Sequence, residues 1–235
     1  MKSQKSAPSP SSAANTHDAP NSRTDKEHKI LSCAAALFAS KGFESTSINE
    51  IGAACGLAKP TLYHYFRDKN SIYAGIVVTV LRELCEAVEE AVVRIDGAEN
   101  KLRTYMLSHS RFFEERYAEY LTAQLGYRNL SLPGDRRTAL RYRDRHEANL
   151  RRIVEEGIGD GVFRAVDPAT CSRLVLSSLN WMVRWYKPDG PQRATEIAGA
   201  YYDLILRGIA AAARTPAKRS SADAPVKKTR RRRAR

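Results

Sequence analysis

The strongest candidates for chemistry in this sequence lie in the stretch 56–66. Within six residues it carries an amine, two hydroxyls and an imidazole, which belong to Lys59, Thr61, Tyr63 and His64. All four groups can bond phosphate oxygens or base edges. A helix-turn-helix presents such groups to DNA at the N-terminal end of its second helix. We therefore interpret this stretch as a DNA-binding element, whose chemistry is binding.

The helix predicted after Gly56 is too short to be stable alone, so neighbouring elements must position it. Thr24–Glu27 forms a capping box, which predicts a helix that ends at Gly42. Ser47–Glu50 forms a second capping box and opens a short helix that Gly56 terminates. Together the three helices predict a helix-turn-helix domain over residues 24–70.

A long helix is predicted to follow this domain. Asp68 caps it, and apolar residues recur every four positions from Lys69 to about Arg94. Further helical patterns lie near 98–116, 118–125, 135–156, 168–186 and 197–209. No strand alternation occurs along the sequence. We therefore predict an all-α protein of about nine helices, in which residues 71–213 form a helical ligand-binding and dimerisation domain.

The net charge of +13 is concentrated at the ends of the chain. Residues 1–23 carry +2 and lack periodicity, which predicts a disordered arm. Residues 214–235 carry +9 and are predicted to form a disordered basic tail. This tail either adds phosphate contacts or only keeps the protein soluble. Because the remaining residues carry only +2, the stretch 56–66 must bind through placed contacts more than through bulk charge.

Other function classes lack support in the sequence. No apolar run approaches the ~18 residues that a membrane-spanning helix needs, and no signal-peptide core is present, so we expect a cytoplasmic protein without a membrane partner. The Gly-x-Gly-x-x-Gly, His-Glu-x-x-His, Gly-x-Ser-x-Gly and Walker patterns are missing, so we expect no enzyme, catalytic residue or cofactor. No metal site is expected either, because metal-ligand spacing is lacking among the four cysteines, Cys33, Cys55, Cys85 and Cys171.

A family resemblance rests on three segments of the N-terminal domain. They read ALFASKGF at 36–43, TSINEIG at 46–52 and GLAKPTLYHYF at 56–66, and Asp68-Lys69 follows them. Together they resemble the DNA-binding domain of TetR/AcrR-type bacterial transcriptional regulators. One departure is Ala58, where the family often has a Ser or Thr that caps the helix.

The resemblance implies a homodimer that binds a double-stranded, palindromic DNA operator. It assigns DNA contacts to Thr46, Ser47, Lys59, Pro60, Thr61, Tyr63, His64 and Lys69. Thr46 and Ser47, at a helix N-terminus, would bind a phosphate. Lys59 and Thr61 would enter the major groove, and Lys69 would contact a flanking phosphate. For Tyr65 and Phe66 simple packing is the favoured interpretation.

A second resemblance covers residues 180–191, NWMVRWYKPDGP, with parts of 196–208. These residues are similar to a TetR subgroup that tends to control fatty-acid, steroid or aromatic catabolism and to respond to acyl-CoA thioesters. An acyl-CoA needs an apolar tunnel and cations for its phosphates. The candidate ligand-binding residues are Tyr105, His109, Arg111, Asn180, Trp181 and Arg184. The alternative is structural, since aromatic stripes usually form cores and a buried histidine is more often a satisfied core residue.

The last two helices have more apolar surface than one core requires. We expect a two-fold dimer face there, formed by Leu174, Leu179, Trp185, Tyr201, Leu204 and Ile205. The leading hypothesis is a ligand-responsive repressor of catabolic genes that a small effector releases from its palindromic operator. The favoured effector is an acyl-CoA thioester. One alternative is a TetR-type repressor of a drug efflux pump that senses a hydrophobic compound. Another is a protein that coats DNA without sequence preference.

Overall fold

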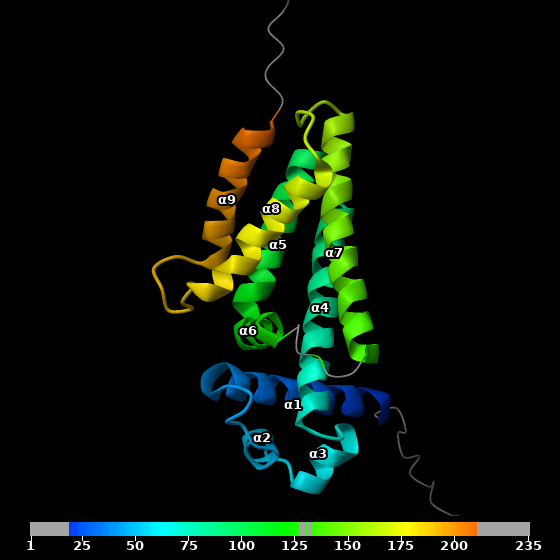
Figure 1. Cartoon of the computed structure of the whole chain (residues 1–235), viewed down its shortest axis with the longest axis vertical. Coiled ribbons are helices and arrows are strands. Elements are labelled where there is room, and N and C mark those ends of the chain that lie inside the picture. Colours follow the sequence, from blue (N-terminus) through cyan, green and yellow to red (C-terminus); the bar gives the residue numbers. More distant parts are fainter. Residues whose placement is uncertain (1–18, 127–129, 131–132, 211–235) are drawn as a thin grey trace, which may run out of the picture.

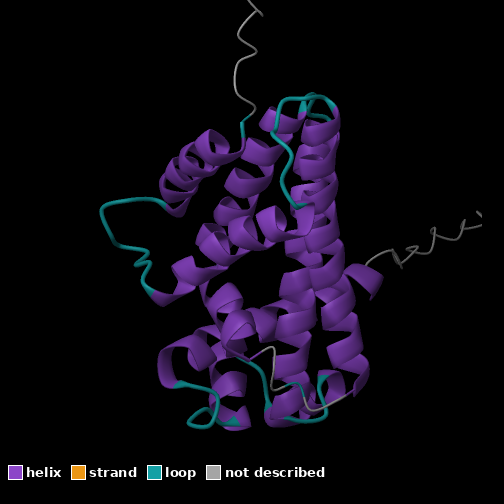
Figure 2. Ribbon diagram, turned by 45° about the horizontal axis from the view of Figure 1, so that its top comes forward, coloured by secondary structure: helices purple, strands orange, loops and turns teal. Residues whose placement is uncertain are grey.

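The computed structural model describes residues 19–126, 130 and 133–210. Over these residues it contains nine α-helices and no strand, apart from one isolated bridge between Phe163 and Ala210 (Figures 1 and 2). None of the described helices is long and apolar enough to cross a membrane. The all-α prediction is confirmed. The predicted arm up to residue 18 and the basic tail lie outside the described residues.

The first three helices form the head of the molecule, residues 19–65. They are α1 (Ala19–Lys41), α2 (Ile48–Cys55) and α3 (Lys59–Tyr65). Ser47 caps α2 in the predicted capping box with Glu50. Gly56 ends α2 with a φ of 68°, in the left-handed region that favours glycine. Ala58 makes no side-chain cap for α3, as the departure from the family pattern implied.

The predicted start of α1 is wrong. The helix begins at Ala19 instead of Thr24, so residues 19–23 do not belong to an arm. The Thr24–Glu27 sequence lies inside the helix, where it does not act as a cap. Arg23 donates instead to the Glu27 carboxylate at 3.3 Å, one helical turn along the exposed face. Such a pair stabilises the interior of a helix. The capping pattern alone did not show whether Thr24–Glu27 lies at the start of a helix or inside it.

The remaining helices form the body of the molecule. Their bounds are α4 (Lys69–Val93), α5 (Ala98–Glu115), α6 (Tyr117–Gly126), α7 (Pro133–Gly159), α8 (Pro168–Trp181), a 3-10 turn (Met182–Arg184) and α9 (Ala194–Ile209). Asp68 caps α4 by accepting from the Ser71 backbone at 2.7 Å. The stripe along α4 is buried from Ile72 to Val88. This confirms the long helix and fixes its inward face.

Two helix ends differ from the predictions. Helix α7 continues through Gly157 to Gly159, because the ring of Phe163 packs against Gly157 where a Cβ would lie only 2.1 Å away. Gly157 permits this close packing and does not break the helix. Helix α8 ends at Trp181, where a 3-10 turn replaces the predicted continuation to Tyr186.

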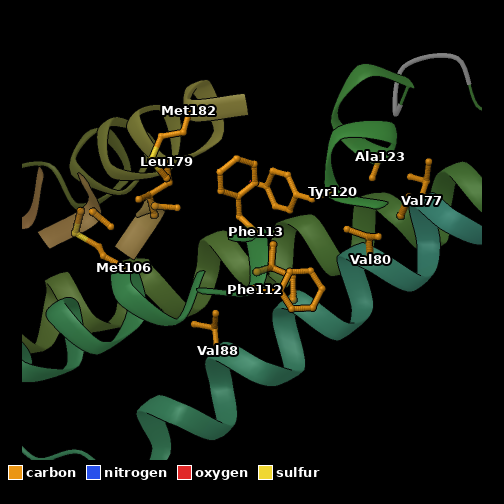
Figure 3. Close-up of a cluster of buried hydrophobic side chains, with 14 of the residues drawn as sticks. Val77, Val80, Val88, Met106, Phe112, Phe113, Tyr120, Ala123, Leu179 and Met182 are labelled. Atoms are coloured by element: carbon orange, nitrogen blue, oxygen red, sulfur yellow. The ribbon is translucent and has the colours of Figure 1, made fainter. Parts of the chain in front are cut away.

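The arrangement places the head at one end of the molecule (Figure 1). Helix α4 runs from the head into the body alongside α7, and α6 lies between α1 and the upper helices. Helices α8 and α9 lie towards the opposite end. Figure 3 shows Ala123 of α6 beside Val77 and Val80 of α4, and Tyr120 beside Phe113. Helix α6 therefore contributes to the body core while it contacts the head.

Candidate functional site

The exposed face of α3 is the first part of the site. Lys59, Pro60, Tyr63 and His64 are exposed and Thr61 is half-buried. The Lys59 amine lies 5.9 Å from the centre of the Tyr63 ring. Leu62 is only 1% exposed and packs α3 onto the hydrophobic core. The amine, hydroxyls and imidazole predicted for this stretch therefore lie on one accessible surface, at the end of the molecule remote from α9 (Figure 1).

Helix α3 is held against α2 by a close approach at Gly52. A Cβ at this position would lie 2.8 Å from the Leu57 carbonyl oxygen and 3.2 Å from a methyl of Leu62. Gly52→Ala is therefore expected to destabilise the protein by about 1–3 kcal/mol, because a backbone oxygen cannot move aside cheaply. Urea unfolding measures this change.

The matched control is Gly159→Ala at the end of α7, where nothing lies within 4 Å of the added carbon. It should leave stability unchanged or slightly raised, since alanine favours helix more than glycine does. Equal effects of the two substitutions would contradict the packing argument.

Three of the predicted DNA contacts lie around the loop between α1 and α2. Ser47 is exposed, and its hydroxyl caps α2. Thr46 is only 2% exposed, and its hydroxyl donates to the Gly42 carbonyl at 2.9 Å. A phosphate cannot reach this hydroxyl, which corrects the prediction for Thr46. The Lys69 amine donates to the carbonyl oxygens of Phe43 at 2.7 Å and Glu44 at 3.3 Å, so this lysine also secures the loop.

The second part of the site is a cavity of about 330 Å³ among α4, α5, α6, α7 and α8, which we call the central cavity. Its apolar wall consists of Val80, Leu81, Leu84, Ala123 and Leu176. Its polar wall consists of His109, Tyr120, Gln124, Tyr142, Arg143, His146, Glu147, Arg173, Ser177 and Asn180. A cavity in which polar groups converge beside an apolar wall can bind a small molecule.

The predicted ligand residues divide between several places. His109 and Asn180 line the central cavity. Tyr105 lines a second cavity of similar volume among α4, α5 and α7. Arg111, Trp181 and Arg184 are exposed and line neither cavity, and the Arg184 guanidinium lies 5.6 Å from the Trp181 ring. The structure therefore brings only two of the six predicted residues, His109 and Asn180, into the central cavity.

A hydrogen-bonded relay crosses the polar wall of the central cavity. His109 Nδ1 lies 3.1 Å from His146 Nε2, and His109 Nε2 lies 2.9 Å from the Tyr120 hydroxyl. That hydroxyl lies 2.7 Å from Asn180 Oδ1. The Gln124 amide donates to both of these oxygens at 3.0 Å. His109 is thus a satisfied buried histidine, as the structural alternative held, and it also lines the cavity.

Sequence reasoning missed three members of this relay, Tyr120, Gln124 and His146. Tyr120 and Gln124 lie one helical turn apart in α6, which was predicted only as a short piece. His146 lies in α7 among many charged residues, which favoured a solvated surface for the whole helix. A histidine and a leucine at positions 146 and 150, four residues apart, were the available signal that one face of α7 is buried.

Burial keeps both histidines of the relay neutral. It lowers the pKa of His109 from 6.5 to about 3 and lowers the pKa of His146 well below 6.5. The unfolded chain therefore binds protons more readily than the folded protein below pH 6.5. Stability that is present above pH 6.5 is lost as the pH falls towards 3.

We expect the free energy of unfolding to decrease between pH 7 and pH 5, by up to about 1.4 kcal/mol per pH unit for each histidine. Urea unfolding at several pH values measures this slope. His109→Gln should flatten the slope, because the glutamine side chain takes up no proton in either the folded or the unfolded state. A wild-type slope in the His109 variant would contradict the assignment.

The rim of the central cavity carries two arginines and a glutamate. The side chains of Arg143 and Arg173 are 51% and 66% exposed, and Arg143 pairs with the carboxylate of Asp144 at 3.0 Å. Arg173 lies 3.6 Å from the carboxylate of Glu147, which is 23% exposed. The charged residues that line the cavity are therefore two arginines and one glutamate, whereas the relay side of the cavity is neutral and buried.

Helix α6 joins the central cavity to the head. Tyr120, Ala123 and Gln124 face the cavity. On the other side of α6, Glu119 accepts from the Ser32 hydroxyl of α1 at 2.9 Å. The Thr122 hydroxyl donates to the Ala35 carbonyl of α1 at 3.2 Å. A displacement of α6 by a bound molecule would therefore be transmitted directly to the first helix of the head.

An exposed apolar surface lies on α8, α9 and the segment between them. Leu174, Trp181, Trp185 and Leu204 are 58%, 64%, 46% and 67% exposed. Tyr201 and Ile205 are half-buried beside them in α9. Leu179 is only 1% exposed and belongs to the core, which corrects its assignment to the dimer face. An apolar surface of this kind marks an interaction site, and we call it the α8–α9 face.

Known proteins share this architecture. Residues 30–76 match the family described as bacterial regulatory proteins, tetR family, and residues 96–209 match a tetracyclin repressor-like C-terminal domain. The crystal structure of PfmR, a TetR family transcriptional regulator from Thermus thermophilus, is 47% identical with a TM-score of 0.72 and covers 76% of this chain and 97% of that one.

Two further relatives have informative names. The HTH-type transcriptional repressor KstR2 of Mycolicibacterium smegmatis is 26% identical over 194 residues, which are 82% of this chain and 94% of that protein. A structure of AibR in complex with isovaleryl coenzyme A and operator DNA is 24% identical with a TM-score of 0.69 and covers 77% of this chain and 98% of that one. The chain shares the head and the helical body of these regulators and matches both of their domain families in sequence, and it belongs to the TetR family of bacterial transcriptional regulators.

Proposed function

We propose that this regulator is a homodimeric repressor of catabolic genes that an acyl-CoA thioester releases from its operator. The observation that carries the proposal is the central cavity, which combines a buried apolar wall with two arginines at its rim, Arg143 and Arg173. An acyl chain is apolar and the CoA moiety carries phosphates, which arginine binds through charge-assisted hydrogen bonds. The names of KstR2 as a repressor and of AibR as a complex with isovaleryl coenzyme A and operator DNA support the class of ligand and the mode of action.

Release from DNA requires that the effector bind more tightly to the state in which the spacing of the two heads does not fit the operator. A ligand with equal affinity for both states would shift nothing. We infer that an acyl chain beside Tyr120 and Gln124 displaces α6, and that the hydrogen bonds to Ser32 and Ala35 carry this movement into α1. Helix α4 runs from the head along the same cavity, and the angle between α4 and the body changes when α6 moves.

The test is a thermal-shift screen of the full chain against CoA thioesters of increasing acyl length, with free CoA and the matching fatty acids as references. A thioester at 100 times its Kd should stabilise the protein by about 2.7 kcal/mol at the midpoint. Free CoA and free acids should stabilise it less, because each contacts only one half of the site. Stabilisation by hydrophobic cations alone, bound near Glu147, would favour the efflux-pump alternative and refute the thioester.

Arg143→Gln and Arg173→Gln test the rim. Together they should weaken thioester binding at least tenfold while the affinity for the matching fatty acid falls less, because the acid has no CoA phosphates. Lys101→Gln, at the second cavity, is the control and should leave thioester binding unchanged. An equal loss for thioester and acid would show that the arginines do not bind the CoA moiety.

A further inference from the structure

The second cavity lies further from the head than the central cavity, and both have a volume of about 330 Å³. Helix α4 runs away from the head (Figure 1), and it lines the central cavity up to Leu84 and the second cavity from Val88 to Val93. Tyr105 of the second cavity is fully buried, and its ring stacks on His146 of the central cavity with 4.8 Å between the ring centres. The Tyr105 hydroxyl also donates to the His146 carbonyl at 2.9 Å. This buried pair lies between the two cavities, so the second cavity is a separate site.

Part of the lining of the second cavity is an aliphatic wall, which consists of Val88, Val92 and Val93 of α4 and Ile153 of α7. Val93 is 74% exposed, the highest value among the large apolar side chains of the described residues. Ile153 is only 5% exposed, so the wall extends from the solvent to the core. Val93 lies outside the α8–α9 face, and a dimer through that face leaves it in water. An aliphatic ligand on this wall would remove apolar surface from water.

The carboxylates that line the second cavity already have cationic partners. The Lys101 amine donates to both oxygens of Glu156, at 2.7 and 2.8 Å. Glu89 accepts from Arg145 Nε at 2.8 Å, and Arg145 approaches it from outside the cavity lining. Each of the two carboxylates is therefore neutralised by one cation.

Arg152 is the remaining charged residue of this lining, and it forms no ion pair with any residue that the structure describes. Its guanidinium donates to the side-chain oxygen of Asn149, a neutral residue that also lines the cavity. This contact places the guanidinium at the cavity and leaves its other N–H groups available. Arg152 is exposed, so a ligand can reach it from the solvent. The second cavity thus combines an aliphatic wall with one cation that lacks a carboxylate partner.

We propose that the second cavity binds an aliphatic carboxylate, with its carboxylate group on Arg152 and its chain on the aliphatic wall. A guanidinium binds a carboxylate through two parallel charge-assisted hydrogen bonds. An amine of the same chain length is repelled by the cation, and an amide leaves the cation unpaired. The site is independent of the proposed acyl-CoA effector, because Tyr105 and His146 separate it from the central cavity.

The experiment is calorimetric titration of the full-length protein with straight-chain carboxylates from butanoate to decanoate. The primary amide and the primary amine of each chain length are the references. We expect one tight carboxylate site per chain, which binds the best carboxylate at least about tenfold more tightly than its amide or amine. Equal binding of the amide, or no binding of any carboxylate, would refute the inference.

Two variants locate the site. Arg152→Gln should weaken carboxylate binding by about tenfold to a hundredfold and leave amide binding unchanged, because it removes only the charge-assisted pair. Val92→Trp keeps the charge and fills the cavity, so it should prevent binding of both. The matched control is Arg136→Gln, which removes an exposed arginine of the same helix outside both cavities and should change nothing.

Thermal unfolding of each variant shows whether it is folded. Wild-type carboxylate affinity in either folded Arg152→Gln or folded Val92→Trp protein would overturn the inference.

The central cavity is the competing location for the carboxylate. The tight carboxylate site should be unchanged in the Arg143→Gln, Arg173→Gln protein, and it should remain available when a CoA thioester saturates the central cavity. Full competition between the two ligands, or loss of the tight site in the Arg143→Gln, Arg173→Gln protein alone, would refute a separate site. If no thioester binds, the proposed effector is refuted, and the result with Arg152→Gln still decides this inference.

Discussion

Alanine at both Lys59 and Tyr63 is expected to weaken binding to the operator about a hundredfold. Each side chain lies on the exposed face of α3, and a well-placed contact to a base or its phosphate contributes about 1–3 kcal/mol. Because about 1.4 kcal/mol corresponds to a factor of ten, two such losses give about two orders of magnitude. Fluorescence anisotropy with an operator selected from random DNA measures the loss.

The control removes a positive charge elsewhere. Lys187→Ala changes an exposed lysine in the loop before α9, far from the head, and it should leave affinity within about twofold. The double variant should lose far more affinity for the operator than for random DNA, since base contacts specify sequence and phosphate contacts do not. Equal losses on both DNAs would refute sequence recognition by α3 and favour the non-specific alternative.

Leu204→Glu is expected to convert the dimer to monomers and to reduce operator affinity at least a hundredfold. Leu204 is 67% exposed on the α8–α9 face, and a two-fold interface through this face would bury the new carboxylate on both subunits. A monomer binds only one half-site and loses the effective concentration that links the two heads. Sedimentation velocity at micromolar protein measures the association, and anisotropy measures the affinity.

Val93→Glu provides the matched control for this prediction. Val93 is 74% exposed at the end of α4 and lies outside the α8–α9 face, so it adds the same charge to another exposed apolar position. This variant should remain a dimer with unchanged operator affinity. A dimeric Leu204→Glu protein, or dissociation of both variants, would refute dimerisation through α8 and α9.

The parts of the fold that sequence could predict are those encoded by neighbouring residues. The capping box at Ser47 and the four-residue spacing along α4 depend on contacts within one helix, and both are confirmed. The prediction of where α1 starts failed because Thr24–Glu27 lies inside a helix, although it has the residue types of a capping box at a helix start. The prediction that α7 ends before Gly157 failed because Phe163 packs against this glycine from beyond the following loop, and a local pattern does not reveal that contact.

The candidate site shows the same division. The exposed face of α3 followed from a short helix with one apolar side. The relay did not, because its hydrogen-bonded pairs lie up to 60 residues apart in the sequence and meet only when α5, α6, α7 and α8 pack together. Thr46 is the clearest failure, since a threonine at a helix N-terminus has the composition of a phosphate ligand but its hydroxyl turns inward to Gly42. Side-chain direction at such a position depends on the loop, which sequence spacing does not fix.

The proposed switch depends on the helix that the two parts of the site share. Helix α6 presents Tyr120 and Gln124 to the cavity and Glu119 and Thr122 to α1. By linkage, an effector that lowers affinity for the operator must itself bind more weakly to the operator-bound protein, by the same factor. Loss of the Thr122 hydrogen bond in Thr122→Val should therefore change this coupling factor while each ligand still binds.

The most direct test of the ligand-responsive repressor is the anisotropy of labelled operator bound to the full-length dimer, titrated with the CoA thioester that stabilises the protein most. We predict that saturating thioester weakens operator binding by at least tenfold, that free CoA does not, and that the loss is reduced in the Arg143→Gln, Arg173→Gln protein. Operator affinity that stays unchanged at saturating thioester would contradict the proposal, even if the thioester binds.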